Sequence, residues 1–162
     1  MPYPMSPLSI DQAETLPFRM VTERRLPASP ERVFEVLSDP ATWPHWFTKM
    51  TRATWTEGES RVGALRTVEI QDGVTQIWEE KVVAWEPGRR FAFNTIGGNL
   101  PLAKALVEDF QLSPDGDGCR FVWTVHYDPT LLVRILHPLV RMLFRKMFSS
   151  ATDGLSRYVS RG

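Results

Sequence analysis

Five turn signals divide the middle of the chain into short alternating segments, and one long helical pattern follows them. The signals are Glu57-Gly58, Asp72-Gly73, Pro87-Gly88, Gly97-Gly98-Asn99 and the run from Pro114 to Gly118. Alternating segments between such turns predict about six consecutive strands, joined mostly as antiparallel hairpins. After Asp128-Pro129 the hydrophobic period becomes helical. Residues 130–159 therefore predict one long helix, which Pro138 either kinks or divides into a first turn and a main helix.

The segments before these strands predict one strand and a helical region. Residues 18–26 alternate weakly and are rich in residues that favour strands. Residues 29–39 predict a helix, because Ser29 can cap it, Pro30 suits its first position and Glu31 favours its positive end. Two prolines in PATWPHWFTK, residues 40–49, limit that segment to a turn or a short second helix. This order predicts an α+β fold, with a curved antiparallel sheet and a helix laid across one face.

Composition and charge narrow the classes of protein and of site. A chain of 162 residues predicts one domain, spanning residues 17–162, and the prolines near the start predict a flexible N-terminal arm over residues 1–16. The arm has neither a cationic start nor a long apolar run, so we expect no signal peptide and no membrane span. Nineteen basic residues balance nineteen acidic ones, which argues against nucleic-acid binding.

The inventory of cysteine and histidine argues against a metal centre. A single cysteine, Cys119, excludes an internal disulfide and favours a reducing, cytoplasmic compartment. One cysteine and three scattered histidines have no metal-ligand spacing, so we expect no metal. The chain also contains no nucleotide-binding or phosphate-binding fingerprint, and we expect no cofactor.

Several charged residues fall in phase with the apolar face of the predicted sheet. Arg66 alternates with Val68 and Ile70, and Glu108 alternates with Phe110. A three-residue loop over residues 71–73 keeps the apolar faces in register, and it places Arg66 opposite Trp78 and next to Glu80. Two explanations stay open. These charged groups pair with one another in an internal network, or they line a partly hydrated pocket with apolar walls and a few fixed polar groups.

Three stretches resemble a known superfamily: RRLPASPERVFEVLSDPATWPHWF, GVTQIWEEKVVAWEPGRRFAFNT and SPDGDGCRFVWTVHYDP. With the closing helix, they are similar to the START-like, or SRPBCC, polyketide cyclase/dehydrase-like proteins. The resemblance implies a helix-grip fold, in which a sheet of about seven strands wraps around the long C-terminal helix and encloses a deep cavity. Two short helices after the first strand would close one end of it. Trp43, Trp46 and Phe47 would then line the cavity or cap the core, and Trp46 is the expected cavity contact.

The first functional hypothesis is a carrier or sensor that binds a hydrophobic small molecule, aromatic, polyketide-like or lipid-like. Its candidate ligand-binding residues, from the inward phase and the resemblance, are Trp46, Trp55, Arg66, Trp78, Glu80, Phe93, Glu108, Phe110 and Trp123. Aromatic walls supply apolar contact area, and Arg66 could orient a carboxylate, phenolate or carbonyl group. This hypothesis needs no catalytic residue, and we assign none. The chain is expected to act as a monomer or a homodimer.

Two alternatives belong to other classes. An enzyme similar to polyketide aromatase/cyclases would use Arg66 to stabilise an oxyanion and Glu80 or Glu108 as acid or base. Against it, the sequence contains no legible Ser/His/Asp or Cys/His constellation. A membrane-associated lipid- or quinone-binding protein would contact an anionic surface weakly through the final helix. That helix carries Arg134, Arg141, Arg145 and Lys146 among its apolar residues.

Overall fold

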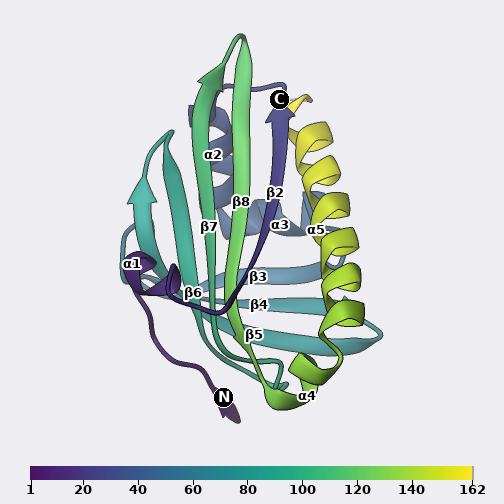
Figure 1. Ribbon diagram of the computed structural model, residues 1–162. Helices are drawn as coiled ribbons and strands as arrows, with labels where there is room; N and C mark the ends of the chain where they lie inside the picture. Colours follow the sequence, from purple (N-terminus) through teal and green to yellow (C-terminus); the bar gives the residue numbers. More distant parts are fainter. Residues whose placement is uncertain (162) are drawn as a thin grey trace.

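The computed structural model describes residues 1–161 and has a single curved antiparallel sheet gripping a long C-terminal helix (Figure 1). The strands are β1 (Tyr3–Pro4), β2 (Phe18–Leu26), β3 (Met50–Glu57), β4 (Leu65–Asp72), β5 (Val74–Glu86), β6 (Arg90–Gly98), β7 (Ala103–Asp115) and β8 (Gly118–Pro129). The helices are α1 (Ile10–Ala13), α2 (Pro30–Ser38), a 3-10 turn (Pro40–Thr42), α3 (Trp43–Trp46), α4 (Leu131–Ile135) and α5 (His137–Val159). The predicted α+β helix-grip architecture is confirmed.

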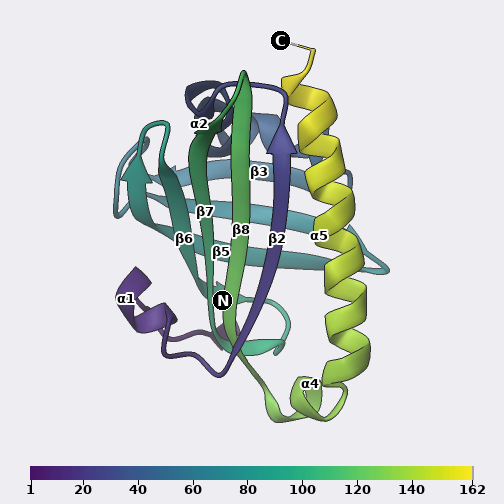
Figure 2. The same cartoon turned by 45° about the horizontal axis from the view of Figure 1, so that its top comes forward.

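The sheet runs in the order β2-β8-β7-β6-β5-β4-β3, so each strand from β3 to β8 pairs with its chain neighbour. The first long strand, β2, closes the β8 edge. Two residues of β1 add an eighth strand, which pairs with β6 at Gly97 and Gly98. Figure 2 shows how β3, β4 and β5 cross behind the other strands, so that α5 lies against the inside of the curve.

The predicted helices and their boundaries follow the capping residues. Ser29 accepts a hydrogen bond from the Arg32 N–H, and Pro30 occupies the first position of α2. The aromatic segment forms the predicted short helix, α3, directly after a 3-10 turn. Pro138 lies in the first turn of α5, immediately after α4 ends. Of the two alternatives for Pro138, the structure therefore has the division into a short helix and a main helix.

The predicted register of the β4–β5 hairpin is wrong by two residues. Asp72 still pairs with Val74, so the chain reverses around Gly73 alone. Gly73 has a φ of 77°, in the left-handed region that glycine adopts without steric cost. The ladder is thus longer than a three-residue loop would allow, and Arg66 lies directly opposite Glu80 instead of Trp78.

Residues 1–16, where a flexible arm is expected, contact the domain at several points. Met5 is buried, and its N–H donates to the carbonyl of Ile96. The Leu8 N–H donates to the side-chain oxygen of Asn94 at 2.9 Å. Ser9 and Gln12 form a capping box on α1. Neither the flexibility of this arm nor the domain boundary at residue 17 is tested by these contacts, and both stay predictions.

Candidate functional site

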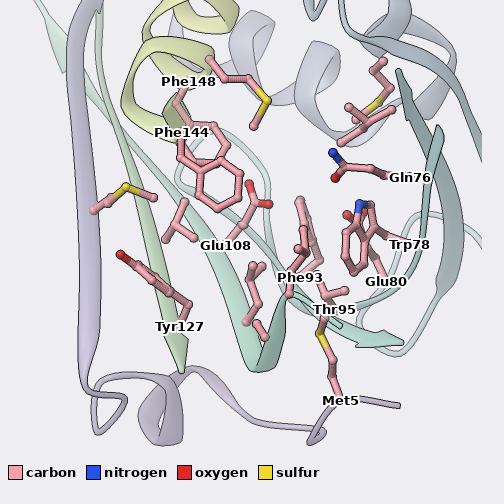
Figure 3. A pocket seen from close by; sticks show the side chains of 18 of the residues that line it. Met5, Gln76, Trp78, Glu80, Phe93, Thr95, Glu108, Tyr127, Phe144 and Phe148 are labelled. Carbon is pink, nitrogen blue, oxygen red and sulfur yellow. The ribbon is translucent and has the colours of Figure 1, made fainter. Parts of the chain in front are cut away.

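A cavity lies between the concave face of the sheet and the helices α4 and α5 (Figure 3). About 90 Å³ of it is open to the centre of a water-sized molecule. Its wall is formed by Met5, Met20, Trp43, Phe47, Met50, Ile70, Gln76, Trp78, Glu80, Phe93, Thr95, Leu102, Ala103, Leu106, Glu108, Val125, Tyr127, Pro129, Val133, Phe144, Met147 and Phe148. Nearly all of this wall is apolar, and only a few side chains offer hydrogen bonds to a ligand, as is typical of small-molecule sites.

Four of the nine predicted site residues line the cavity: Trp78, Glu80, Phe93 and Glu108. Three others lie directly behind the wall. The Trp123 ring packs 5.0 Å from the Phe110 ring, and its Nε1–H donates to Glu108 at 2.8 Å. Arg66 is fully enclosed and contacts the wall residues Trp43, Glu80 and Phe93. These three support the wall without forming it.

The remaining two, Trp46 and Trp55, do not line the cavity, although the Trp46 ring packs 4.5 Å from that of the wall residue Trp43. Trp43 and Phe47 form that part of the wall instead of Trp46. Trp46 occupies the interface between α3 and α5, because its backbone oxygen packs against Gly154 of α5. Trp55 is half-buried on β3, where its ring packs 6.4 Å from that of Trp85. Which of the nine residues a ligand contacts stays a prediction.

The pattern missed several wall residues for two separate reasons. Thr95 lies on β6, where almost every side chain is buried, so alternation cannot distinguish its two faces. Met5, Phe144 and Met147 come from the arm and from α5, and only the tertiary fold brings them to the sheet. Tyr127 was detectable, because it alternates with Trp123 and Val125 on β8.

Arg66 is a buried cation surrounded by aromatic rings. Its Nε donates to Glu80 Oε2 at 2.6 Å. The guanidinium carbon lies 4.4 Å from the centre of the Trp43 ring and 4.2 Å from that of Phe93. Within the part of the chain that the structure describes, its Nη1 and Nη2 make no hydrogen bond, so these ring faces are their electrostatic partners. Tertiary packing thus holds Arg66 in place from three sides.

Two carboxyl groups share this buried space with the single Arg66 cation. Burial raises the pKa of Glu80, although the charge and hydrogen bond of Arg66 oppose the rise. Burial also raises the pKa of Glu108 to about 8, and the nearby Glu80 adds to the rise, while the Trp123 hydrogen bond and Arg66 oppose it. One ionised carboxylate balances one guanidinium. We therefore assign the negative charge to Glu80, beside Arg66, and the proton to Glu108 at neutral pH.

Glu108 is the polar group best placed to meet a ligand. It is enclosed by protein yet retains some accessible surface, and that surface faces the cavity. Figure 3 shows its carboxyl group between the aromatic side chains of Phe93 and Phe144. Two positions along the same β7–β8 ladder, the Tyr127 hydroxyl is hydrogen-bonded to His137 Nε2 at 2.7 Å. A protonated Glu108 can donate its O–H to an oxygen of a ligand.

Residues 17–160 match the model of a family described as polyketide cyclase / dehydrase and lipid transport. Uncharacterized proteins of Mycobacterium tuberculosis and Mycobacterium bovis are 32% identical to this chain over 151 residues, which cover 89% of this chain and 88% of theirs.

Solved structures share the fold at lower identity. A Thermus thermophilus protein superposes with a TM-score of 0.77 at 22% identity, covering 89% of this chain and 98% of its own. An aromatase/cyclase from a Streptomyces species superposes with a TM-score of 0.76 at 12% identity, covering 89% of this chain and 94% of its own. At these identities the likeness concerns the fold alone.

Residues 1–161 contain neither a membrane-spanning helix nor a cluster of metal ligands. No helix there is long and apolar enough to cross a membrane. No group of three or more His, Cys, Asp or Glu side chains there is placed to hold a metal ion.

Proposed function

Because the chain belongs to the polyketide cyclase / dehydrase and lipid transport family, we propose that it binds a hydrophobic small molecule in the cavity beneath α5, as a carrier or sensor. The compartment we propose is the reducing cytoplasm. Its support is Cys119, the only cysteine, which is buried in the core and unpaired. The protein would act there as a monomer or a homodimer.

The observation that best supports this proposal is the Glu108 carboxyl in a mostly apolar wall, where burial raises its pKa to about 8. A ligand that is apolar over most of its surface but has one carbonyl or hydroxyl oxygen would match this wall. Its oxygen would accept the Glu108 proton in a hydrogen bond, and its carbon skeleton would displace water from the apolar wall. A charged ligand group gains no ion pair at this position, since Glu80 already neutralises Arg66, so the apolar part of a ligand supplies the binding energy.

The methionines of the wall would let the cavity adapt to such a ligand. Four of the six methionines in the chain line it: Met5, Met20, Met50 and Met147. The open space of about 90 Å³ is small for a polyketide or a lipid. Unbranched thioether side chains change rotamer at little cost, so they can move aside as a larger ligand enters.

A second candidate function, a cyclase or dehydratase, is favoured by one specific observation. The pKa of Glu108, raised to about 8, lies near neutral pH, where a group can both give and accept a proton efficiently. In this candidate Glu108 would be the acid or base. Arg66 is less suited to the oxyanion role expected from the sequence, because aromatic rings and Glu80 separate it from the cavity.

The test combines identification of the natural ligand with a defined probe. Native mass spectrometry of the purified protein, followed by extraction under denaturing conditions, would identify any molecule that purifies with it. The probe is anilinonaphthalene sulfonate, titrated by fluorescence against the wild type and Leu106→Trp, which fills the cavity. We expect Leu106→Trp to bind the probe at least about tenfold more weakly. The apolar contact that the probe loses is worth at least the roughly 1.4 kcal/mol to which a tenfold change in Kd corresponds. Val62→Trp, on an exposed loop residue, is the matched control.

A pH titration distinguishes Glu108 from the rest of the wall. As pH rises through about 8, Glu108 ionises and repels the sulfonate, so probe affinity should fall in the wild type. Glu108→Gln keeps the acceptor for Trp123 but cannot ionise, and its affinity should stay constant. Equal probe binding by wild type and Leu106→Trp at all pH values would refute the cavity as the binding site.

A further inference from the structure

The exposed apolar side chains of this protein are concentrated on one helical segment. Of the twelve large apolar residues that are exposed within residues 1–161, seven lie between Leu131 and Leu143. They include Leu131 at 72% exposure, Ile135 at 69% and Met142 at 58%. We call this surface of residues 131–146 the α4–α5 face. In Figures 1 and 2, α4 lies at the end of the molecule opposite to the C-terminus. Such a concentrated apolar patch marks an interaction surface.

The charges within this face all have one sign. Arg134, Arg141, Arg145 and Lys146 lie among the apolar residues, while residues 129–152 contain no aspartate or glutamate. None of these four cations takes part in an ion pair within the part of the chain that the structure describes. The partner of this face must therefore accept apolar side chains and supply negative charge.

We propose that the α4–α5 face docks on the surface of an anionic phospholipid bilayer. Exposed leucine, isoleucine and methionine side chains can enter the boundary between headgroups and acyl chains, while Arg145 and Lys146 contact lipid phosphates. A second copy of the chain fits this face less well. A two-fold dimer would place the face against itself, so four cations would meet four cations with no carboxylate between them.

The same segment also forms part of the cavity wall. Val133 of α4 and Phe144 and Met147 of α5 point their side chains to the cavity, while neighbouring residues form the exposed face. In Figure 3, Phe144 and Phe148 extend from α5 toward the sheet. When the protein is docked, this wall of the cavity would lie against the lipid. An apolar ligand could then pass between the bilayer and the cavity without crossing water. This last step rests on the proposed function, whereas the docking itself does not.

The experiment is cosedimentation of the full chain with two kinds of vesicle, pure phosphatidylcholine and equal parts phosphatidylcholine and phosphatidylglycerol. The wild type should bind the anionic vesicles, and added salt should weaken this binding. Arg145→Gln/Lys146→Gln should lower the affinity for these vesicles about thirty-fold, because each cation near an anionic surface contributes about 1 kcal/mol of binding free energy. Leu139→Ser/Leu143→Ser should lower it at least about tenfold. Both pairs lie at exposed positions, so the fold should persist.

Two controls keep the result specific. Arg61→Gln/Lys81→Gln removes two exposed cations elsewhere and should bind anionic vesicles like the wild type. Leu106→Trp, with its filled cavity, should also bind them, so a failure of the ligand-binding proposal would leave this result unaffected.

Three outcomes would overturn the docking proposal. One is that the wild type fails to bind anionic vesicles. Another is that the Arg145/Lys146 variant binds them as well as the wild type does. The third is a concentration-dependent dimer in sedimentation equilibrium that Leu139→Ser/Leu143→Ser dissociates, because the face would then belong to a second copy.

Discussion

A buried ion pair places two charges beside the cavity. Arg66 and Glu80 are opposite each other on β4 and β5, and both side chains are almost fully enclosed. A buried pair of this kind contributes little net stability compared with apolar residues of the same shape, but the loss of one partner leaves an uncompensated charge. The two charges also act in opposite directions on the neighbouring Glu108, since Glu80 raises its pKa and Arg66 lowers it, so burial stays the main cause of the raised pKa.

This argument predicts an asymmetric double-mutant cycle. Arg66→Met keeps the packing against Trp43 and Phe93 but leaves Glu80 alone, and we expect a loss of about 3–5 kcal/mol in the free energy of unfolding. Arg66→Met/Glu80→Met should lose less than Arg66→Met alone. Urea unfolding followed by circular dichroism would measure both.

The stability of the Arg66→Met variant should also depend on pH. Without Arg66, Glu80 must be protonated in the folded state, whereas in the unfolded chain it ionises near pH 4.3. The folded single variant then binds more protons than the unfolded chain, so its stability should fall further as pH rises above about 4.3. The surface pair of Arg52 and Glu69, 3.9 Å apart, is the control, and Arg52→Met should lose less than about 1 kcal/mol. An additive cycle at Arg66 and Glu80 would contradict this view.

At the scale of elements, the contact between α3 and α5 determines how closely the long helix approaches the sheet. Gly154 of α5 lies against the backbone oxygen of Trp46, and a Cβ at this position would overlap with that atom. In an exposed helix, glycine to alanine gains about 1 kcal/mol. Here we expect Gly154→Ala to destabilise the protein by about 1–3 kcal/mol, because α5 must shift away from α3.

Thermal unfolding of Gly154→Ala would measure this loss, with Ser149→Ala at an exposed position of the same helix as control. Since α5 supplies Phe144, Met147 and Phe148 to the cavity, the shift should also change probe affinity. A stabilised Gly154→Ala variant would mean that the two helices do not pack as closely as described.

The elements themselves could be predicted because local signals specify them. Ser29 and Pro30 define the start of α2, and the turn residues separate the strands from β3 to β8. The β4–β5 register could not be predicted with the same certainty. The predicted and observed registers differ by two residues, so both keep Arg66, Val68 and Ile70 on one face. The alternation of apolar and polar residues cannot distinguish two registers that differ by two residues.

The site could be predicted only where alternation is informative. Glu80 and Glu108 alternate with apolar neighbours on half-polar strands, and both line the cavity. Trp43 and Trp46 are three residues apart in a four-residue helix, and no periodic pattern is long enough to determine which one faces the cavity. The arm and α5 contribute wall residues through tertiary contacts, which the sequence of either segment does not specify.

At the scale of the whole molecule, residues 1–8 contribute one side chain, Met5, to the cavity wall although they precede the segment that matches the family. Met5 lines the cavity, β1 pairs with β6, and the Leu8 N–H binds Asn94. These contacts are few compared with the seven long strands and α5, so the arm should add little to global stability while it restricts access to the cavity.

Removal of residues 1–8 should therefore change the access of a ligand to the cavity much more than it changes the stability of the fold. We expect the truncated protein to bind anilinonaphthalene sulfonate several-fold faster in stopped-flow mixing, because Met5 no longer covers its part of the cavity. The melting temperature should fall by only a few degrees, as expected for a loss of about 1 kcal/mol in a domain of this size. Met5→Ala is the matched variant, since it removes the wall side chain and keeps the backbone pairing of β1. If neither the association rate nor the melting temperature changes on truncation, the arm is a flexible appendage and the cavity is bounded by the domain alone.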